Sequence, residues 1–244
     1  QEQEQGEEEE EEGGRAQSEH RELTVAAWWR GITQLNTDAG QLLDRSLQLG
    51  MDKPIALFAR AAIAINSGTP EDFQCAVHLL EQVITRNKEL MALEQQGVPV
   101  EDTIALENAY NQRALALLSL KRYAEAEEHF LLAVEQKPGL WEAYINLATL
   151  YFETHRPSAA KEVLFVGRDR YTESTSGPVH LTFLIQLGYA EELLGDMASA
   201  AEHYAHGLQL VEECQRTGHP YDQNHAMKLQ HNWEHVQSLL RLKE

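Results

Sequence analysis

A small residue returns at a regular interval in the second half of the chain, within the same surrounding pattern each time. Ala126 and Ala160 are 34 residues apart, and Ala200 follows after 40 residues, which leaves six residues for a longer turn. Helix pairs that recur at about 34 residues are typical of a helical solenoid, in which each unit packs only on its neighbours. The spacing therefore predicts an all-α array of repeats rather than a fold around one central core.

The unit of residues 107–138 shows why this pattern forms a pair of helices. Each helix has one apolar face, and the chain passes between the two through a short polar turn. Pro138 ends the second helix, because proline has no N–H to donate and its ring clashes with the preceding turn. The residues of the two faces are Tyr110, Ala114 and Leu117 in the first helix, and Tyr123, Ala126, Phe130 and Ala133 in the second.

Two further units repeat this scheme, over residues 141–170 and 181–212, although Glu191 stands where the earlier units have an apolar side chain. The units resemble the tetratricopeptide repeat, a 34-residue helix–turn–helix module. The resemblance implies a right-handed helical solenoid of such repeats. We expect three repeats over residues 107–219 and a C-terminal capping helix over residues 220–244, since the last repeat of a solenoid needs a cover with a polar outer side.

The N-terminal part of the chain follows the pattern less regularly. Residues 17–106 are interpreted as degenerate helical hairpins, because an insert at residues 87–102 lengthens one second helix and then turns near Gly97. Residues 1–16 contain eight of the negative charges in a run of glutamate, glutamine and glycine. Such a run offers no apolar surface to bury, so we expect a disordered acidic tail.

The composition excludes several classes of partner. The net charge of −19 at pH 7 argues against nucleic acid, since phosphate binding requires a basic surface. No run approaches the roughly 20 apolar residues of a membrane span. Two distant cysteines favour the cytoplasm or another reducing intracellular compartment. Import into an organelle, with a targeting segment removed, stays open because the chain does not begin with methionine.

The sequence offers little for catalysis or metal binding. The pairs His203/His206 and His231/His235 have helical ligand spacing, but two histidines make only half a zinc site and no CxxC accompanies them. No glycine-rich phosphate loop is present. We therefore expect no enzyme activity, no cofactor and no metal. The alternatives are a metal-binding or enzymatic protein that uses the C-terminal histidines, and the repeat region of a longer enzyme.

The resemblance places the binding site in the concave groove, which the first helix of each repeat lines. Some family members hold the acidic C-terminus of chaperones there with lysine, arginine and asparagine. Asn111, Thr182 and Gln186 stand here where positive charge is expected, so a chaperone-tail clamp is disfavoured. The predicted groove residues are instead apolar groups and amides: Asn111, Leu115, Ile145, Asn146, Thr149, Phe152, Ile185, Gln186 and Tyr189.

Amides can hold a peptide backbone, and apolar side chains can receive a helix face. The sequence thus favours a non-catalytic protein-interaction scaffold that binds a peptide or helix of a partner protein. The scaffold is expected to act as an adaptor, as a complex subunit or as an assembly factor. Trp28 and Trp29 form a second candidate docking point, with packing beneath a neighbouring repeat as the alternative.

Overall fold

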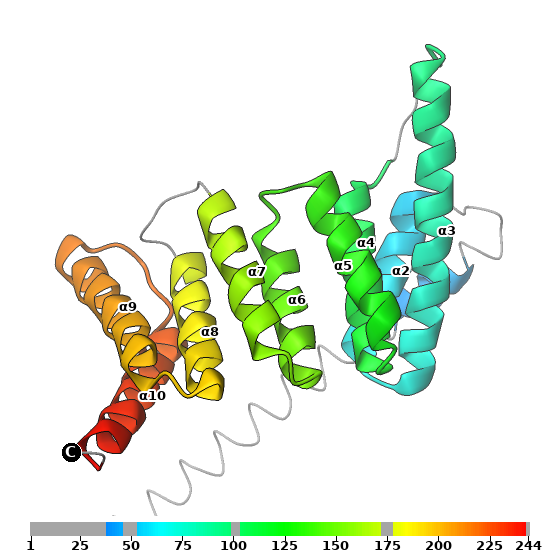
Figure 1. Ribbon diagram of the computed structural model, residues 1–244. Coiled ribbons are helices and arrows are strands. Elements are labelled where there is room, and N and C mark those ends of the chain that lie inside the picture. The colour runs from blue at the N-terminus through cyan, green and yellow to red at the C-terminus, as the bar shows by residue number, and fades with distance from the viewer. Residues whose placement is uncertain (1–37, 46–52, 99–102, 172–177, 243–244) are drawn as a thin grey trace, which may run out of the picture.

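A computed structural model describes residues 38–45, 53–98, 103–171 and 178–242 of the chain. The acidic segment 1–16, the Trp28-Trp29 pair and the rest of residues 17–37 lie outside this described part. All regular elements within it are helices, and no strand occurs there (Figure 1). The predicted all-α fold is confirmed.

The helices follow one another in pairs, and a final helix ends the array (Figure 1). Residues 38–45 form a short helical segment before the first pair. The pairs are α2 (Pro54–Ser67) with α3 (Pro70–Gln95), α4 (Leu106–Ser119) with α5 (Tyr123–Gln136), α6 (Trp141–Glu153) with α7 (Pro157–Arg170), and α8 (Pro178–Leu194) with α9 (Met197–Thr217); α10 (Gln223–Arg241) follows.

The turn inside each of the last three pairs has the same geometry. Its central residue adopts a positive φ: 59° at Lys121, 57° at His155 and 83° at Gly195. This residue and the next one donate backbone hydrogen bonds to carbonyls three and five residues earlier, as in a Schellman motif. The same chain reversal therefore recurs, although only one of the three turns has the glycine that makes a positive φ easy to adopt.

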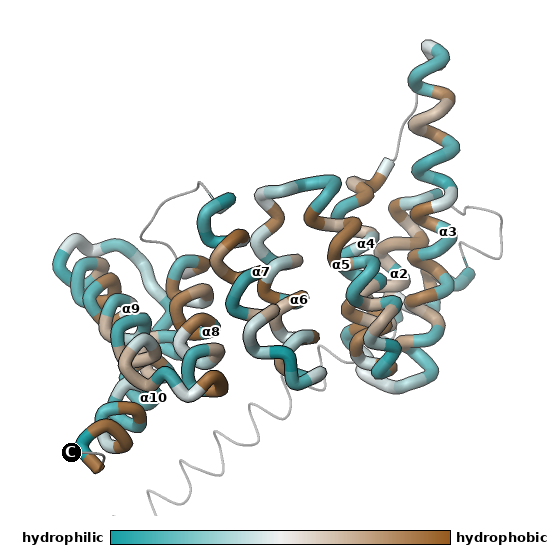
Figure 2. The backbone as a smooth tube through the Cα atoms, in the orientation of Figure 1, coloured by the Kyte–Doolittle hydropathy of each residue, from teal (hydrophilic) through white to brown (hydrophobic). Residues whose placement is uncertain are grey.

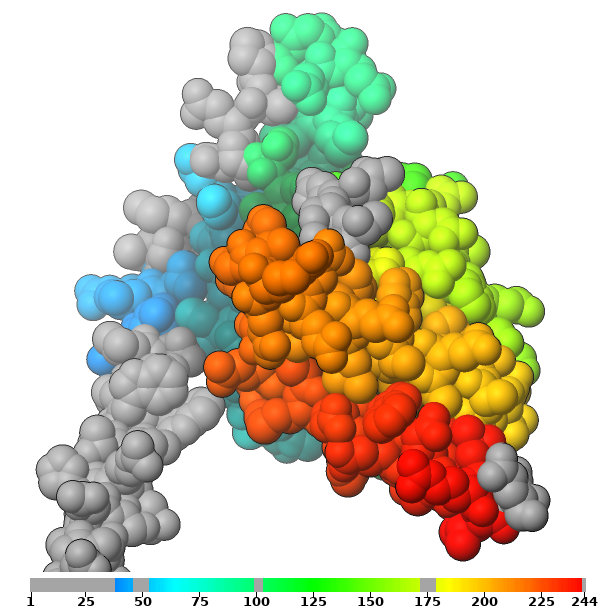
Figure 3. Space-filling view, turned by 90° about the vertical axis from the view of Figure 1, so that its left-hand side faces the viewer, coloured from blue at the N-terminus to red at the C-terminus, as the bar shows by residue number. Residues whose placement is uncertain are grey.

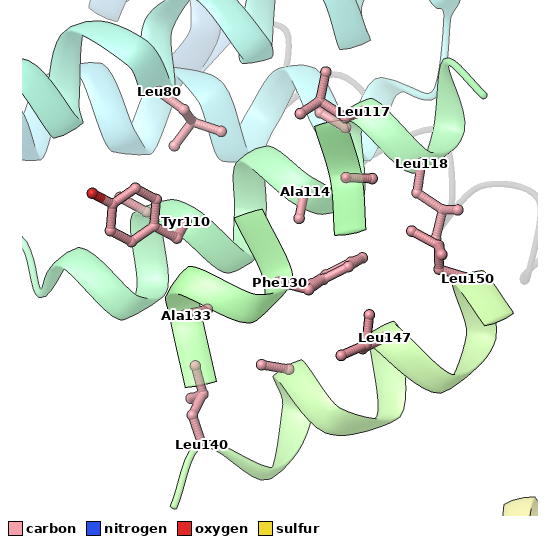
Figure 4. Packing of buried hydrophobic residues seen from close by; sticks show 14 of the residues in the cluster. Leu80, Tyr110, Ala114, Leu117, Leu118, Phe130, Ala133, Leu140, Leu147 and Leu150 are labelled. Carbon is pink, nitrogen blue, oxygen red and sulfur yellow. The ribbon is translucent and has the colours of Figure 1, made fainter. Parts of the chain in front are cut away.

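Small residues at the helix crossings allow the close packing of the array. Ala114 of α4 and Ala126 of α5 are fully buried, and the Phe130 ring lies between α4, α5 and α6 (Figure 4). Gly188 of α8 lies directly against the Tyr204 ring of α9, where an added Cβ would come within 2.3 Å of a ring carbon. The recurring small residues noted in the sequence thus lie at close helix crossings, with large side chains filling the space beside them.

The C-terminal helix covers the end of the array. α10 packs along α9 and also touches α8, and both α9 and α10 face the viewer in Figure 3. Leu229 and Val236 of α10 are fully buried. The outer side of α10 shows polar residues, so it closes the last repeat as a capping helix.

The predicted insert lengthens α3. The last turns of this helix extend beyond the body of the array (Figure 1), where hydrophilic and hydrophobic residues alternate (Figure 2). Gly97, with a φ of 83°, then reverses the chain as expected. Met91 and Leu93 on this projecting end are exposed.

The array curves because its two layers of helices pack differently. Consecutive first helices, namely α2, α4, α6 and α8, contact one another. Among the described residues, the backbones of consecutive second helices (α3 with α5, α5 with α7, and α7 with α9) are further apart, although side chains still meet between α7 and α9, where the Phe165 and His203 ring centroids are 6.1 Å apart. The first helices therefore lie on the inside of the curve, and the second helices lie apart on its outside.

Replacing Ala126 with leucine is expected to lower the free energy of unfolding by about 1–3 kcal/mol, because three added carbons have no room at a close crossing. Ala124, two positions earlier in α5, is exposed. Ala124→Leu makes the same change at a roomy site and is the matched control. Guanidinium denaturation of both variants measures the difference. An unchanged midpoint for Ala126→Leu contradicts the close approach of α4 and α5.

Candidate functional site

The predicted concave-surface residues come from the first helices α4, α6 and α8. Asn111 is buried, with 6 % of its surface exposed, and Tyr189 is exposed at 43 %. The other seven residues are half-buried: Leu115, Ile145, Asn146, Thr149, Phe152, Ile185 and Gln186. We call these nine residues the concave surface.

An amide pair joins two neighbouring repeats on this surface. The Nδ2 group of Asn146 donates a hydrogen bond of 3.1 Å to Oδ1 of Asn111. Thr149 also uses its hydroxyl internally, because Oγ1 donates to the Ile145 carbonyl at 3.0 Å. The amide of Asn111 thus contributes to the array's own structure. Much of what remains for a ligand is apolar.

An aromatic pair joins the next two repeats. The rings of Phe152 on α6 and Tyr189 on α8 meet edge to face, with centroids 5.0 Å apart and an interplanar angle of 69°. Leu193, one turn beyond Tyr189, is also exposed. Aromatic side chains provide large contact areas with few rotatable bonds, which makes this pair suited to anchor a partner. None of the nine residues carries a charge.

A polar cluster lies between α7, α8 and α9. The Lys161 Nζ atom is 2.7 Å from Oε1 of the buried Glu191, while the buried Oε2 atom of Glu191 has no hydrogen-bond partner in the described part of the chain. His203 on α9 is half-buried, and this burial lowers its pKa, although the charge of Glu191 acts in the opposite direction. His203 is therefore expected to be neutral at pH 7.

The histidine pairs singled out in the sequence do not come together as one site. The His206 ring lies against His180 of α8, with centroids 5.9 Å apart, and burial lowers the pKa of His180, with His206 and Arg168 adding to the effect. His231 and His235 lie exposed on α10. Within the described ranges no group of three or more His, Cys, Asp or Glu residues is placed to hold a metal ion.

An outer groove of about 690 Å³ lies between the second helices α5 and α7, on the side of α6 away from the concave surface. Sequence reasoning missed it. Leu131 and Val166 line it while remaining exposed at 47 % and 45 %. These two residues are 35 positions apart, close to the repeat length, and this recurrence is the one sequence signal that could have indicated the surface. We define the outer groove by Leu131, Val134, Glu135, Pro138, Tyr144, Leu147, Tyr151, Arg156, Ala159, Glu162, Val163, Val166 and Arg170.

Hydrogen bonds within the protein occupy the hydroxyl groups of the groove's two tyrosines. Tyr144 donates to the Pro138 carbonyl at 3.1 Å, and Tyr151 donates to a Glu127 carboxylate oxygen at 2.9 Å. Burial, together with the Glu127 carboxylate, raises the pKa of Tyr151 to about 12. Arg156 pairs with Glu127 and lies over the Tyr151 ring, 4.5 Å from its centroid. The floor of the groove is therefore formed mainly by the rings of Tyr144 and Tyr151 and by Leu147, while the charged groups of the lining lie around it.

Comparison with known proteins supports the repeat assignment. Residues 117–175 match the tetratricopeptide repeat family. The fold is similar to that of MamA residues 41-end from Desulfovibrio magneticus RS-1, with a TM-score of 0.56, 20% identity, and coverage of 77% of this chain and 96% of that one. It is also similar to BtubC from P. vanneervenii, with a TM-score of 0.57, 13% identity, and coverage of 84% and 91%.

These likenesses concern the fold. No curated protein matched the sequence. Across the described residues, none of the helices combines the length and the apolar character that crossing a membrane requires.

Proposed function

We propose that this protein is a non-catalytic scaffold that binds a partner protein on its concave surface, because residues 117–175 match the tetratricopeptide repeat family and the described residues form an array of paired helices. Arrays of this kind build extended binding surfaces from stacked units. The observation that supports the site most directly is the Phe152–Tyr189 pair, since it places adjoining aromatic rings from two repeats at the surface.

The partner is a peptide or helix with apolar side chains. The concave surface carries no lysine or arginine, so an acidic peptide would find no counter-charge there. Asn146 and Gln186 are half-buried, and the amide groups that they do not use within the array would orient a bound backbone. The protein then acts as a subunit, assembly factor or adaptor of a larger complex.

Phe152→Ala is expected to weaken partner binding by about 2 kcal/mol or more, because central aromatic residues often dominate an interface. Tyr189→Ala is expected to act in the same direction. The measurement is recovery of partners by the purified protein, followed by mass spectrometry, with salt titrated. Recovery by the wild type should change little with salt, because apolar contacts are screened far less than charged ones.

Met227→Ala is the matched control, since Met227 is an exposed apolar residue on α10, away from the predicted concave surface. Circular dichroism first establishes that all three variants fold. If folded Phe152→Ala and Tyr189→Ala recover every partner as well as Met227→Ala does, binding does not use the concave surface. Loss of partners at moderate salt would instead indicate recognition of a basic partner by the chain's excess of acidic residues.

A further inference from the structure

We infer that the outer groove between α5 and α7 is a second docking site, and that it takes an amphipathic helix with an apolar stripe flanked by lysine or arginine. This site lies on the side of α6 that faces away from the concave surface. A protein with both sites would hold two partners back to back on the same repeats. The inference goes beyond the proposed function and does not depend on it.

The apolar character of the groove determines what its centre can accept. Val134 of α5 and Val163 of α7 line opposite walls, and the exposed Leu131 and Val166 continue these walls to the surface. Since both tyrosine hydroxyls already donate hydrogen bonds within the protein, a polar ligand would find few free donors at the centre of the groove, and the charged groups lie at its rim. Apolar side chains are the groups that gain from entering such a groove.

The same reasoning selects a helix over an extended peptide. An extended backbone laid on this floor would bring N–H and C=O groups against carbon, and each unpaired buried group is costly. An α-helix satisfies its own backbone hydrogen bonds and presents only side chains. Because both walls are themselves helices, a third helix can pack its side chains between theirs, as helices in globular proteins do.

The charges on the rim determine what flanks the apolar stripe. Glu135 on α5 and Glu162 on α7 are exposed, and neither forms an ion pair within the described residues. Arg156, by contrast, is already paired with Glu127. Arg170, at the C-terminal end of α7, is an exposed cation of the lining, so carboxylates flank the groove along α5 and the middle of α7, and a positive charge stands at one end. Basic residues on both flanks of a bound helix would meet Glu135 on one wall and Glu162 on the other.

The experiment uses a synthetic helical peptide with a leucine stripe flanked by lysines, and a matched peptide with glutamates in place of the lysines. Fluorescence anisotropy measures the affinity of each peptide for the whole protein. We expect the Leu/Lys peptide to bind, and Leu131→Asp or Val166→Asp to weaken it by about tenfold or more, since each places a charge in the apolar groove. Both sites are already exposed, so these variants are expected to fold.

Charge reversal supplies a sharper test. Glu135→Lys with Glu162→Lys should weaken the Leu/Lys peptide by about tenfold and make the Leu/Glu peptide the better ligand. The matched control reverses Glu202 and Glu212, two exposed carboxylates on α9, so that net charge changes equally. An equal loss in both double variants would show attraction to net charge alone and would overturn the inference.

Two further outcomes also overturn it. One is that the Leu/Lys peptide fails to bind the wild type. The other is that Tyr189→Ala abolishes peptide binding while Val166→Asp does not, because the peptide then occupies the concave surface. That second result leaves the proposed function standing while the outer groove fails, so the two hypotheses are tested separately.

Discussion

Phe130→Ala is expected to lower the free energy of unfolding by about 3–5 kcal/mol, the range for removing a fully buried aromatic ring. Phe130 has no exposed surface. Its ring points between Ala114 of α4 and Leu147 of α6, so it belongs to the interface between two repeats as well as to the core of one (Figure 4). Guanidinium denaturation followed by circular dichroism measures the loss.

Leu131→Ala is the matched control, because Leu131 is the next residue of α5 and is 47 % exposed. Its effect should stay within about 1 kcal/mol, as for most surface substitutions. In a solenoid each repeat is stabilised only by its neighbours, so a cavity at this interface also weakens the coupling between adjacent repeats. The Phe130→Ala transition should therefore broaden as well as shift. Equal losses in the two variants would contradict the packing around Phe130.

Lys161→Met is expected to lower the free energy of unfolding by about 2–3 kcal/mol, because it leaves a buried carboxylate without its counter-charge. Glu191 is only 3 % exposed, and Lys161 is its sole ion-pair partner in the described part of the chain. Replacing both Lys161 and Glu191 should restore the free energy of unfolding that Lys161→Met removes. Glu191→Leu restores the apolar residue that this position has in the preceding repeats, and an apolar substitute for a buried pair is often neutral or stabilising.

The measurement is a double-mutant cycle by chemical denaturation, with Lys161→Met, Glu191→Leu and the combination. Lys137→Met is the control, because its ion pair with Glu107 is longer, at 3.9 Å, and Lys137 is largely exposed. That control should cost less than about 1 kcal/mol. If Lys161→Met is as mild as Lys137→Met, Glu191 is solvated or protonated rather than held by Lys161.

The fold was predictable because each helix pair repeats the same local sequence pattern. The phase of Ala126 and Phe130, the stop at Pro138 and the turn at Gly195 all depend on neighbours within a few residues. Burial then followed from the helical period. Of the predicted degenerate hairpins over residues 17–106, the part before residue 53 lies outside the described residues except for residues 38–45.

The surfaces were harder to predict because they depend on how the repeats are stacked. The period places Asn111 and Asn146 on the same face, but only the offset between α4 and α6 brings their amides within hydrogen-bonding distance. The outer groove depends on the separation of α5 and α7, which a single helix pair does not encode. Leu131 and Val166 therefore read as isolated exposed residues in the sequence. The use of the nine concave-surface residues in binding stays a prediction.

The first helices contact one another, whereas the backbones of the second helices are separated. Bending of the array would change the gaps between the outer helices more than the spacing of the touching inner helices. A helix wedged between α5 and α7 would fix the width of one such gap and hence the local angle of the curve. α6 forms the floor of the outer groove and carries Phe152 on its other side. A helix bound in the outer groove would therefore change the width of the concave surface. Two partners that never touch would thereby influence each other's affinity through the tilt of one helix.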